Sequence, residues 1–135
     1  MDQSAVSRDL NHRSSRSWAM AWSAGGGIIA APVLLLVEVA GAVTRRTGDA
    51  DQGERAAIDL ASDSGVVLID IDSRLAIESA SLASSLRLRG ADAIYVAVAK
   101  RLGVPLITWD AEQRERAASE ISVFTPATAP GKTTA

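Results

Sequence analysis

The chain contains no cysteine and a single histidine, His12, among its 135 residues. Without cysteine the fold cannot depend on disulfides, and thiolate metal sites and cysteine nucleophiles are excluded. One imidazole also argues against a multi-histidine zinc site and against a serine–histidine–aspartate triad. If the chain is an enzyme, carboxylates must therefore supply most of its chemistry.

Neither sign of charge is in excess, because 14 basic and 16 acidic residues give a net charge of −2. This balance excludes a protein that coats nucleic acid through bulk charge. Twelve of the basic residues are Arg, which suits bidentate phosphate contacts, although a GC-rich gene would produce the same bias. Length and a hydrophobic content of 47% indicate one globular domain, which we assign to residues 1–124. Residues 125–135 are small and polar and predict a disordered tail.

One long apolar run raises the question of a membrane span. Residues 25–43 contain a single charge, Glu38. Three consecutive glycines, Pro32 and a carboxylate near the middle argue against a span, because a charge is costly in lipid. No signal peptide is evident at the start of the chain. We therefore expect a cytoplasmic protein that does not associate with membranes.

Short apolar segments alternate with helical patterns along the chain. Strands following one another through helices indicate a mainly parallel sheet covered by helices, which is an α/β fold. In such sheets the working residues lie beyond the carboxyl ends of the strands. The strands are expected near residues 28–30, 66–71, 104–108 and 121–124, and the helices at 32–46, 49–61, 73–86, 90–102 and 111–118.

Three carboxylates stand out by their positions. Glu38 lies deep in an apolar helix, where a carboxylate is costly unless it is paired or coordinated; an ion pair with Arg45 or Arg46 is the structural alternative. Asp92 falls in the first turn of a predicted helix, where the helix dipole alone would favour it. Asp110 falls between a strand and a helix, and with Gln113 three residues later it resembles a capping box.

Together the three acids indicate more than each does alone. A parallel sheet can bring all of them to one end, where they would repel one another unless a cation lay between them. Oxygen ligands without His or Cys select Mg²⁺ or Mn²⁺. Such a cation can activate water for phosphodiester cleavage. Glu38, Asp92 and Asp110 are therefore candidate catalytic and metal-binding residues.

Two segments of the chain resemble a known family. Residues 89–97 (RGADAIYVA), followed by residues 105–110 (PLITWD), are similar to the C-terminal signature of PIN domains, especially VapC-type toxins, and residues 32–40 (PVLLLVEVA) are similar to the second motif. The resemblance spans roughly residues 25–124. It implies a PIN-like three-layer sandwich, a Mg²⁺-dependent ribonuclease, and a small antitoxin that blocks the site. It also implies metal-site roles for the three acids and a supporting role for Thr108.

The N-terminus departs from the family pattern, in which a hydrophobic strand delivers an Asp that a Ser or Thr follows two residues later. Asp2 and Ser4 fit this short pattern, so Asp2 is a further candidate metal ligand and Ser4 a supporting residue; Asp9 is a poorer second match. Only Met1 precedes Asp2, so the sequence predicts that the central strand is missing and that residues 1–17 are an atypical or truncated start. Because the strands beside a missing strand would lack hydrogen-bond partners, we expect the chain to be poorly soluble or inactive.

The resulting prediction is a Mg²⁺-dependent endoribonuclease that acts as the toxin of a toxin–antitoxin pair. Its expected partners are a small antitoxin protein and RNA, and a homodimer is a further expectation. The alternative is a catalytically impaired PIN-like module that retains antitoxin or RNA binding. Trp109, beside Asp110, is a candidate for base contact.

Overall fold

The computed structural model describes residues 4–7, 19 and 21–129. Its sheet has five strands in the order β3-β2-β1-β4-β5, and every pair of neighbours is parallel. This confirms the predicted α/β class with a parallel sheet. The strands are β1 (Ser4–Ser7), β2 (Ile28–Pro32), β3 (Val66–Ile69), β4 (Leu106–Ile107) and β5 (Val123–Phe124).

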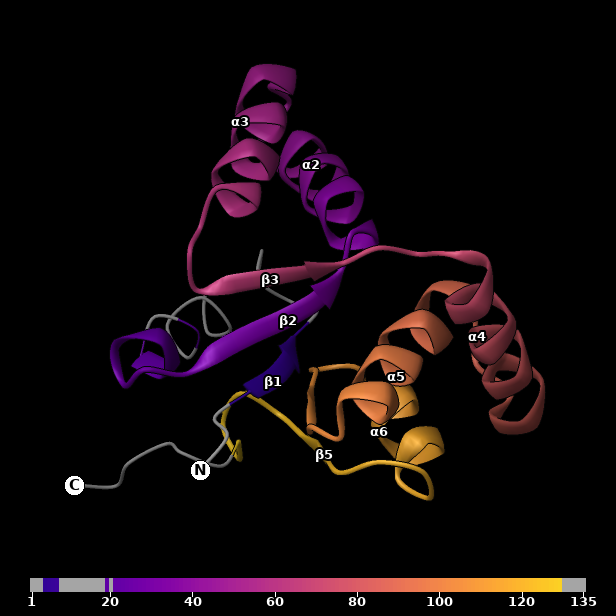
Figure 1. The fold of residues 1–135 in the computed structure, drawn as a ribbon. Helices are drawn as coiled ribbons and strands as arrows, with labels where there is room; N and C mark the ends of the chain where they lie inside the picture. The colour runs from indigo at the N-terminus through magenta and orange to yellow at the C-terminus, as the bar shows by residue number, and fades with distance from the viewer. Residues whose placement is uncertain (1–3, 8–18, 20, 130–135) are drawn as a thin grey trace.

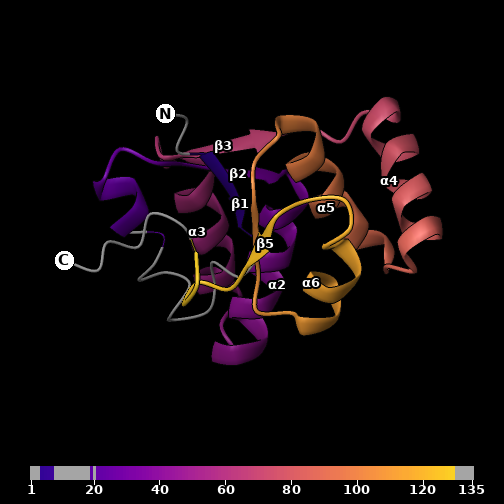
Figure 2. The same cartoon turned by 90° about the horizontal axis from the view of Figure 1, so that it is seen from below.

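Helices lie on both sides of this sheet, which confirms the expected three-layer architecture (Figure 1). The view from below shows α2 and α3 together on one side and α4, α5 and α6 on the other (Figure 2). The helix at the centre of the core is α5, in which residues 95–99 are almost wholly buried. The helices are α2 (Leu34–Thr47), α3 (Ala50–Ala61), α4 (Ser73–Leu86), α5 (Gly90–Leu102) and α6 (Ala111–Ala117).

The central strand is present, so the expectation that the sheet lacks it is wrong. It is β1, and it pairs with β2 on one side and β4 on the other. Ala5 and Val6 of this strand are completely buried. Four residues suffice because both neighbours supply hydrogen-bond partners and the helical layers cover both faces. The predicted loss of solubility and activity, which rested on unpaired neighbouring strands, loses its basis.

The apolar run of residues 25–43 is divided between a turn, a strand and a helix. Pro32 was expected in the first turn of a helix but is the last residue of β2, opposite Ile69 of β3. The Val33 N–H then donates to the Ile69 carbonyl oxygen at 2.9 Å, and α2 begins at Leu34. Within the described part of the chain, no helix is long and apolar enough to cross a membrane.

The helices α2 and α3 form a hairpin that projects from the sheet (Figure 1). Gly48 ends α2 in a left-handed conformation with φ 71°, and the Asp49 side chain caps α3 by accepting from the Asp51 N–H at 2.9 Å. The two helices then approach closely at Gly53, where a Cβ would lie 2.6 Å from the Ala40 carbonyl oxygen. Glycine at this position permits the contact that fixes α2, and α2 carries Glu38.

The first residues of the expected tail form a turn. The Thr128 N–H donates to the Thr125 carbonyl oxygen at 3.1 Å, and the hydroxyl groups of these two residues lie 3.0 Å apart. Ala129 is buried. Residues 130–135, the rest of the predicted disordered tail, lie outside the described residues.

Candidate active site

Glu38 is held by a tyrosine from the helical layer on the other side of the sheet. It lies half-buried on α2, and its Oε1 accepts a hydrogen bond of 2.5 Å from the Tyr95 hydroxyl group of α5. Tyr95 is completely buried. The bond joins two residues that are 57 positions apart in the chain, and it links the helix after β2 to the central helix of the core.

Asp92 lies in the first turn of α5 and is 9% exposed. It precedes Tyr95 by three residues, so the two side chains share one face of the helix. This spacing brings Asp92 to the side of α5 on which Glu38 is bound. The start of α5 favours a negative charge through the helix dipole, which accounts for part of the stability of a buried carboxylate here.

Asp110 caps α6, as the sequence predicted. Its Oδ1 accepts from the Gln113 N–H at 3.1 Å, and its own N–H donates to Thr108 Oγ1 at 3.1 Å. The reciprocal half of a capping box is absent in this segment, because the Gln113 side chain does not return to Asp110. Its Nε2 donates instead to the Asp92 backbone carbonyl oxygen at 3.1 Å. Thr108, which is completely buried, thus positions the backbone of an exposed acid.

These contacts form one network that links the three helices on which the predicted acids lie, and it reaches Asp92 through its backbone carbonyl group. Glu38 is bound through Tyr95 to the helix that carries Asp92, and Asp92 is bound through Gln113 to the helix that Asp110 caps. The network spans α5 together with α2, which follows β2, and α6, which follows β4. Arg114 adds to it by donating from NH1 to the Thr108 carbonyl oxygen at 2.9 Å.

Of the candidate residues near the N-terminus, Ser4 lies apart from Thr108, and the two acids lie outside the described residues. Ser4 is the first residue of β1 and pairs with Ile28, so it lies at the amino end of the strand and apart from Thr108. Asp2 precedes β1 in the sequence, and Asp9 follows its last residue, Ser7, by two positions. Both Asp2 and Asp9 lie outside the described residues.

The donor set suits a hard divalent cation, because every candidate ligand is a carboxylate oxygen. Among the residues described, however, no three Asp, Glu, His or Cys side chains lie close enough together to hold a metal ion. Two buried polar atoms, Ser7 Oγ and Gln113 Oε1, also have no hydrogen-bond partner within the described ranges.

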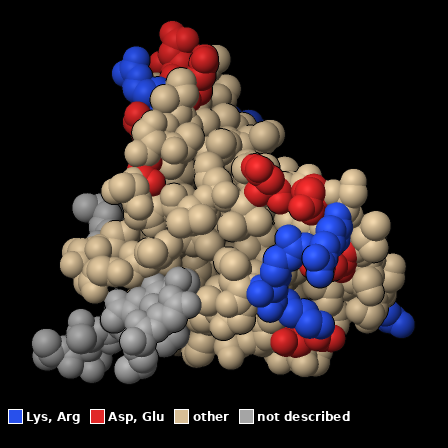
Figure 3. All heavy atoms as spheres, viewed as in Figure 1, with Lys and Arg blue, Asp and Glu red and all other residues tan. Residues whose placement is uncertain are grey.

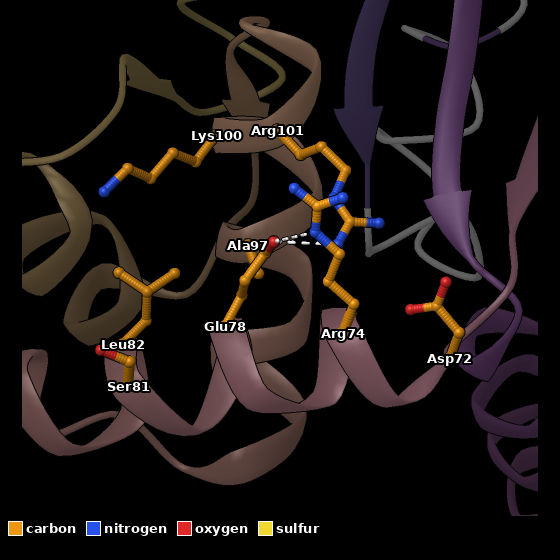
Figure 4. Close-up of a pocket in the computed structure, with 8 residues that line it drawn as sticks. All are labelled: Asp72, Arg74, Glu78, Ser81, Leu82, Ala97, Lys100 and Arg101. Atoms are coloured by element: carbon orange, nitrogen blue, oxygen red, sulfur yellow. Dashed lines mark hydrogen bonds and ion pairs between the residues drawn. The ribbon is translucent and has the colours of Figure 1, made fainter.

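A hollow in the described part of the surface is a different feature. It has a volume of about 580 Å³ and lies between α4 and α5. Figure 3 shows Lys and Arg side chains gathered with Asp and Glu over these helices. In the hollow, Arg74 and Arg101 converge on Glu78, at 3.4 and 2.9 Å (Figure 4). Asp72, another residue of the hollow, caps α4, and none of the three candidate acids lines it.

Sequence reasoning missed two residues of the network. Tyr95 is the single tyrosine of the chain, and its spacing of three from Asp92 was the available signal. The position of Gln113, three residues after Asp110, predicts only a capping box. No feature of the neighbouring sequence indicates that its carboxamide group reaches another helix.

Comparison with solved structures supports the fold. The chain is similar to a chain of a toxin–antitoxin complex from Klebsiella pneumoniae, with 20% identity, a TM-score of 0.64, and coverage of 91% of this chain and 97% of that one. It is similar to a chain of VapBC-1 from Haemophilus influenzae, with 12% identity, a TM-score of 0.67, and coverage of 93% and 98%. A third match, VapBC2 from Rickettsia felis bound to promoter DNA, has 15% identity, a TM-score of 0.65, and coverage of 89% and 96%.

The sequence itself identifies the family. A search of curated protein sequences finds no significant match. The family model of the PIN domain, however, matches residues 1–119. This span includes β1 and all three acids of the network, so the resemblance seen in residues 32–40 and 89–110 extends over most of the chain. The chain belongs to the PIN domain family.

Proposed function

We propose that this chain is a Mg²⁺-dependent endoribonuclease and the toxin of a toxin–antitoxin pair. One observation carries the proposal: the helices that hold Glu38, Asp92 and Asp110, which are far apart in the sequence, are linked by the hydrogen bonds of Tyr95 and Gln113. Membership of the PIN domain family and the similarity to toxin–antitoxin structures support it.

Asp92 and Asp110 are the residues that would hold the cation, and Glu38 would complete the site or orient water. Asp92 is buried at a helix start and Asp110 is exposed at a cap, so one acid is fixed and the other is open to substrate. A divalent cation at such a site activates water and neutralises charge on a phosphate. Mg²⁺ and Mn²⁺ both match an all-oxygen donor set.

A fourth acid would come from the residues after β1. The strand ends at Ser7, so an acid delivered at its carboxyl end must follow residue 7 in the chain. Asp9 meets this requirement and Asp2 does not. We therefore place Asp9 ahead of Asp2 as the fourth ligand, with Thr108 as the supporting hydroxyl residue.

The residues around the acids suit an RNA substrate. The start of α5 offers the positive end of a helix dipole to a phosphate, and the exposed Arg89 precedes it. Trp109, which is 38% exposed and adjacent to Asp110, offers an aromatic face on which a base could stack. Single-stranded RNA is the substrate class that uses both contacts.

The test is an RNA-cleavage assay with the purified 135-residue chain and a labelled single-stranded RNA. We expect cleavage with Mg²⁺, none with EDTA, and recovery when Mg²⁺ or Mn²⁺ is added in excess of EDTA. Cleavage that persists in EDTA would contradict the metal-dependent mechanism.

One observation favours the second candidate, a PIN-like module that binds antitoxin or RNA without cutting. It is the lack of any group of three metal-ligating side chains within the described ranges. RNA retained in a mobility-shift assay, together with no cleavage at any Mg²⁺ or Mn²⁺ concentration, would favour this candidate over the nuclease.

The proposed antitoxin would place a basic side chain at the acids. An Arg would match a carboxylate pair with two aligned hydrogen bonds and cover the apolar surface around it. Co-expression with the product of an adjacent small gene should yield a complex that co-purifies and cleaves RNA more slowly than the free chain. If no neighbour-encoded protein co-purifies, the toxin assignment fails while the nuclease assignment stands.

A further inference from the structure

Gln113 is an unusual residue to find completely buried, since a primary amide carries two donors and an acceptor that must all be satisfied. It lies in α6, three residues after the cap Asp110. A glutamine at this position of a capping box is expected on the surface, close to the start of its own helix. The Gln113 side chain is instead buried and reaches α5.

Its contacts reach both acids of the proposed metal pair. The Gln113 N–H donates to Asp110 Oδ1, and its Nε2 donates to the Asp92 carbonyl oxygen, both at 3.1 Å. The backbone of this residue thus orients the Asp110 carboxylate, and its side chain holds the first turn of α5 next to α6. Its Oε1 is buried and has no partner among the residues that the structure describes.

We propose that Gln113 is a positioning residue that sets the spacing of Asp92 and Asp110 and thereby the affinity for the divalent cation. The residue acts through the acids and does not touch the cation. This inference rests on the proposed metal-dependent function, because it assigns a role toward the same site.

Metal sites depend on such supporting contacts, whose loss typically costs about 10–100-fold in metal affinity or activity. The Gln113→Met variant keeps the length and apolar packing of the side chain and removes the Nε2 hydrogen bond to the Asp92 carbonyl oxygen, while the backbone hydrogen bond to Asp110 remains. Gln52→Met is a matched control: Gln52 also follows a capping Asp by three residues and donates from Nε2 to that residue, Asp49, at 3.2 Å, but it is exposed on α3.

The experiment measures Mn²⁺ binding by calorimetry, at a temperature well below the melting temperature of each variant. We expect Gln113→Met to bind Mn²⁺ about tenfold or more weakly than the wild type, and Gln52→Met to bind within twofold. We also expect the cleavage rate of Gln113→Met to recover as Mn²⁺ is raised to saturation. A lower melting temperature with unchanged Mn²⁺ affinity would show a merely structural role and overturn the inference.

A second variant separates positioning from charge. Gln113→Glu keeps the shape of the side chain but loses the donor to the Asp92 carbonyl oxygen and adds a negative charge. Positioning predicts weaker Mn²⁺ binding, whereas tighter binding would overturn the inference. If the wild type binds Mn²⁺ and cleaves RNA, and the Gln113 variants bind Mn²⁺ with the same affinity, only this inference fails. If the wild type binds no Mn²⁺, the proposed function fails, and the inference fails with it.

Discussion

Removing the Tyr95 hydroxyl group is a sharp test of the link between α2 and α5. The Tyr95→Phe variant keeps the ring of a completely buried residue and loses only the donor to Glu38 Oε1, 2.5 Å away. Hydrogen bonds to charged groups contribute about 1.5–3 kcal/mol. Glu38 is only half-buried, so water replaces part of the lost bond, and we expect a loss of about 1–2 kcal/mol. For a domain of this size each kcal/mol lowers the melting temperature by about 3–5 °C.

A double-mutant cycle isolates this contact from the packing of either residue. The cycle compares Tyr95→Phe, Glu38→Ala and the double variant by urea unfolding. We expect the two losses to be coupled by about 1 kcal/mol or more, because either substitution alone removes the same bond. Losses that add to within about 0.3 kcal/mol would refute the reasoning, since they would mean that the contact does not hold the two helices together.

Two further predictions concern the helical hairpin and the substrate surface. The Gly53→Ala variant should lose about 1–3 kcal/mol of stability in a thermal melt, because its Cβ would lie 2.6 Å from the Ala40 carbonyl oxygen. Gly41→Ala should be neutral or stabilising, since its Cβ meets only the movable end of Arg45, at 3.2 Å; equal losses in the two variants would contradict the packing argument. The Trp109→Ala variant should raise KM for RNA at least about fivefold while Trp109→Phe stays near wild type, as stacking predicts; an unchanged KM in Trp109→Ala would exclude base contact.

Much of the fold could be predicted because local signals agreed with the tertiary structure. The helix of residues 90–102 is bounded by Gly103, in a left-handed conformation with φ 65°, and α6 begins after its cap Asp110, as predicted. The central strand β1 could not be predicted, because a four-residue segment with two apolar residues is typical of many loops. Its assignment depends on the strands on either side, which are distant in the sequence.

The candidate acids were also predicted from local patterns, but their connections were not. The apolar helix around Glu38 predicts that this carboxylate has a partner or a function. The structure confirms a partner, because Glu38 is half-buried and accepts a hydrogen bond. Its partner Tyr95 comes from a helix 57 residues later. Gln113 reaches Asp92 instead of completing a capping box because α5 packs within reach of α6, which no spacing in the sequence reveals.

The central claim is that the buried acid of this network supports metal-dependent RNA cleavage, and Asp92→Asn tests it most directly. The measurement is the rate of cleavage of single-stranded RNA as a function of Mg²⁺ concentration, with Asp59→Asn, an exposed acid of α3, as the control. Losing one carboxylate weakens cation binding and relieves repulsion among the acids. We predict that Asp92→Asn melts at or above the wild-type temperature and cleaves at least about 100-fold more slowly, while the control is unchanged. Cleavage by Asp92→Asn within about twofold of the wild type would contradict the account.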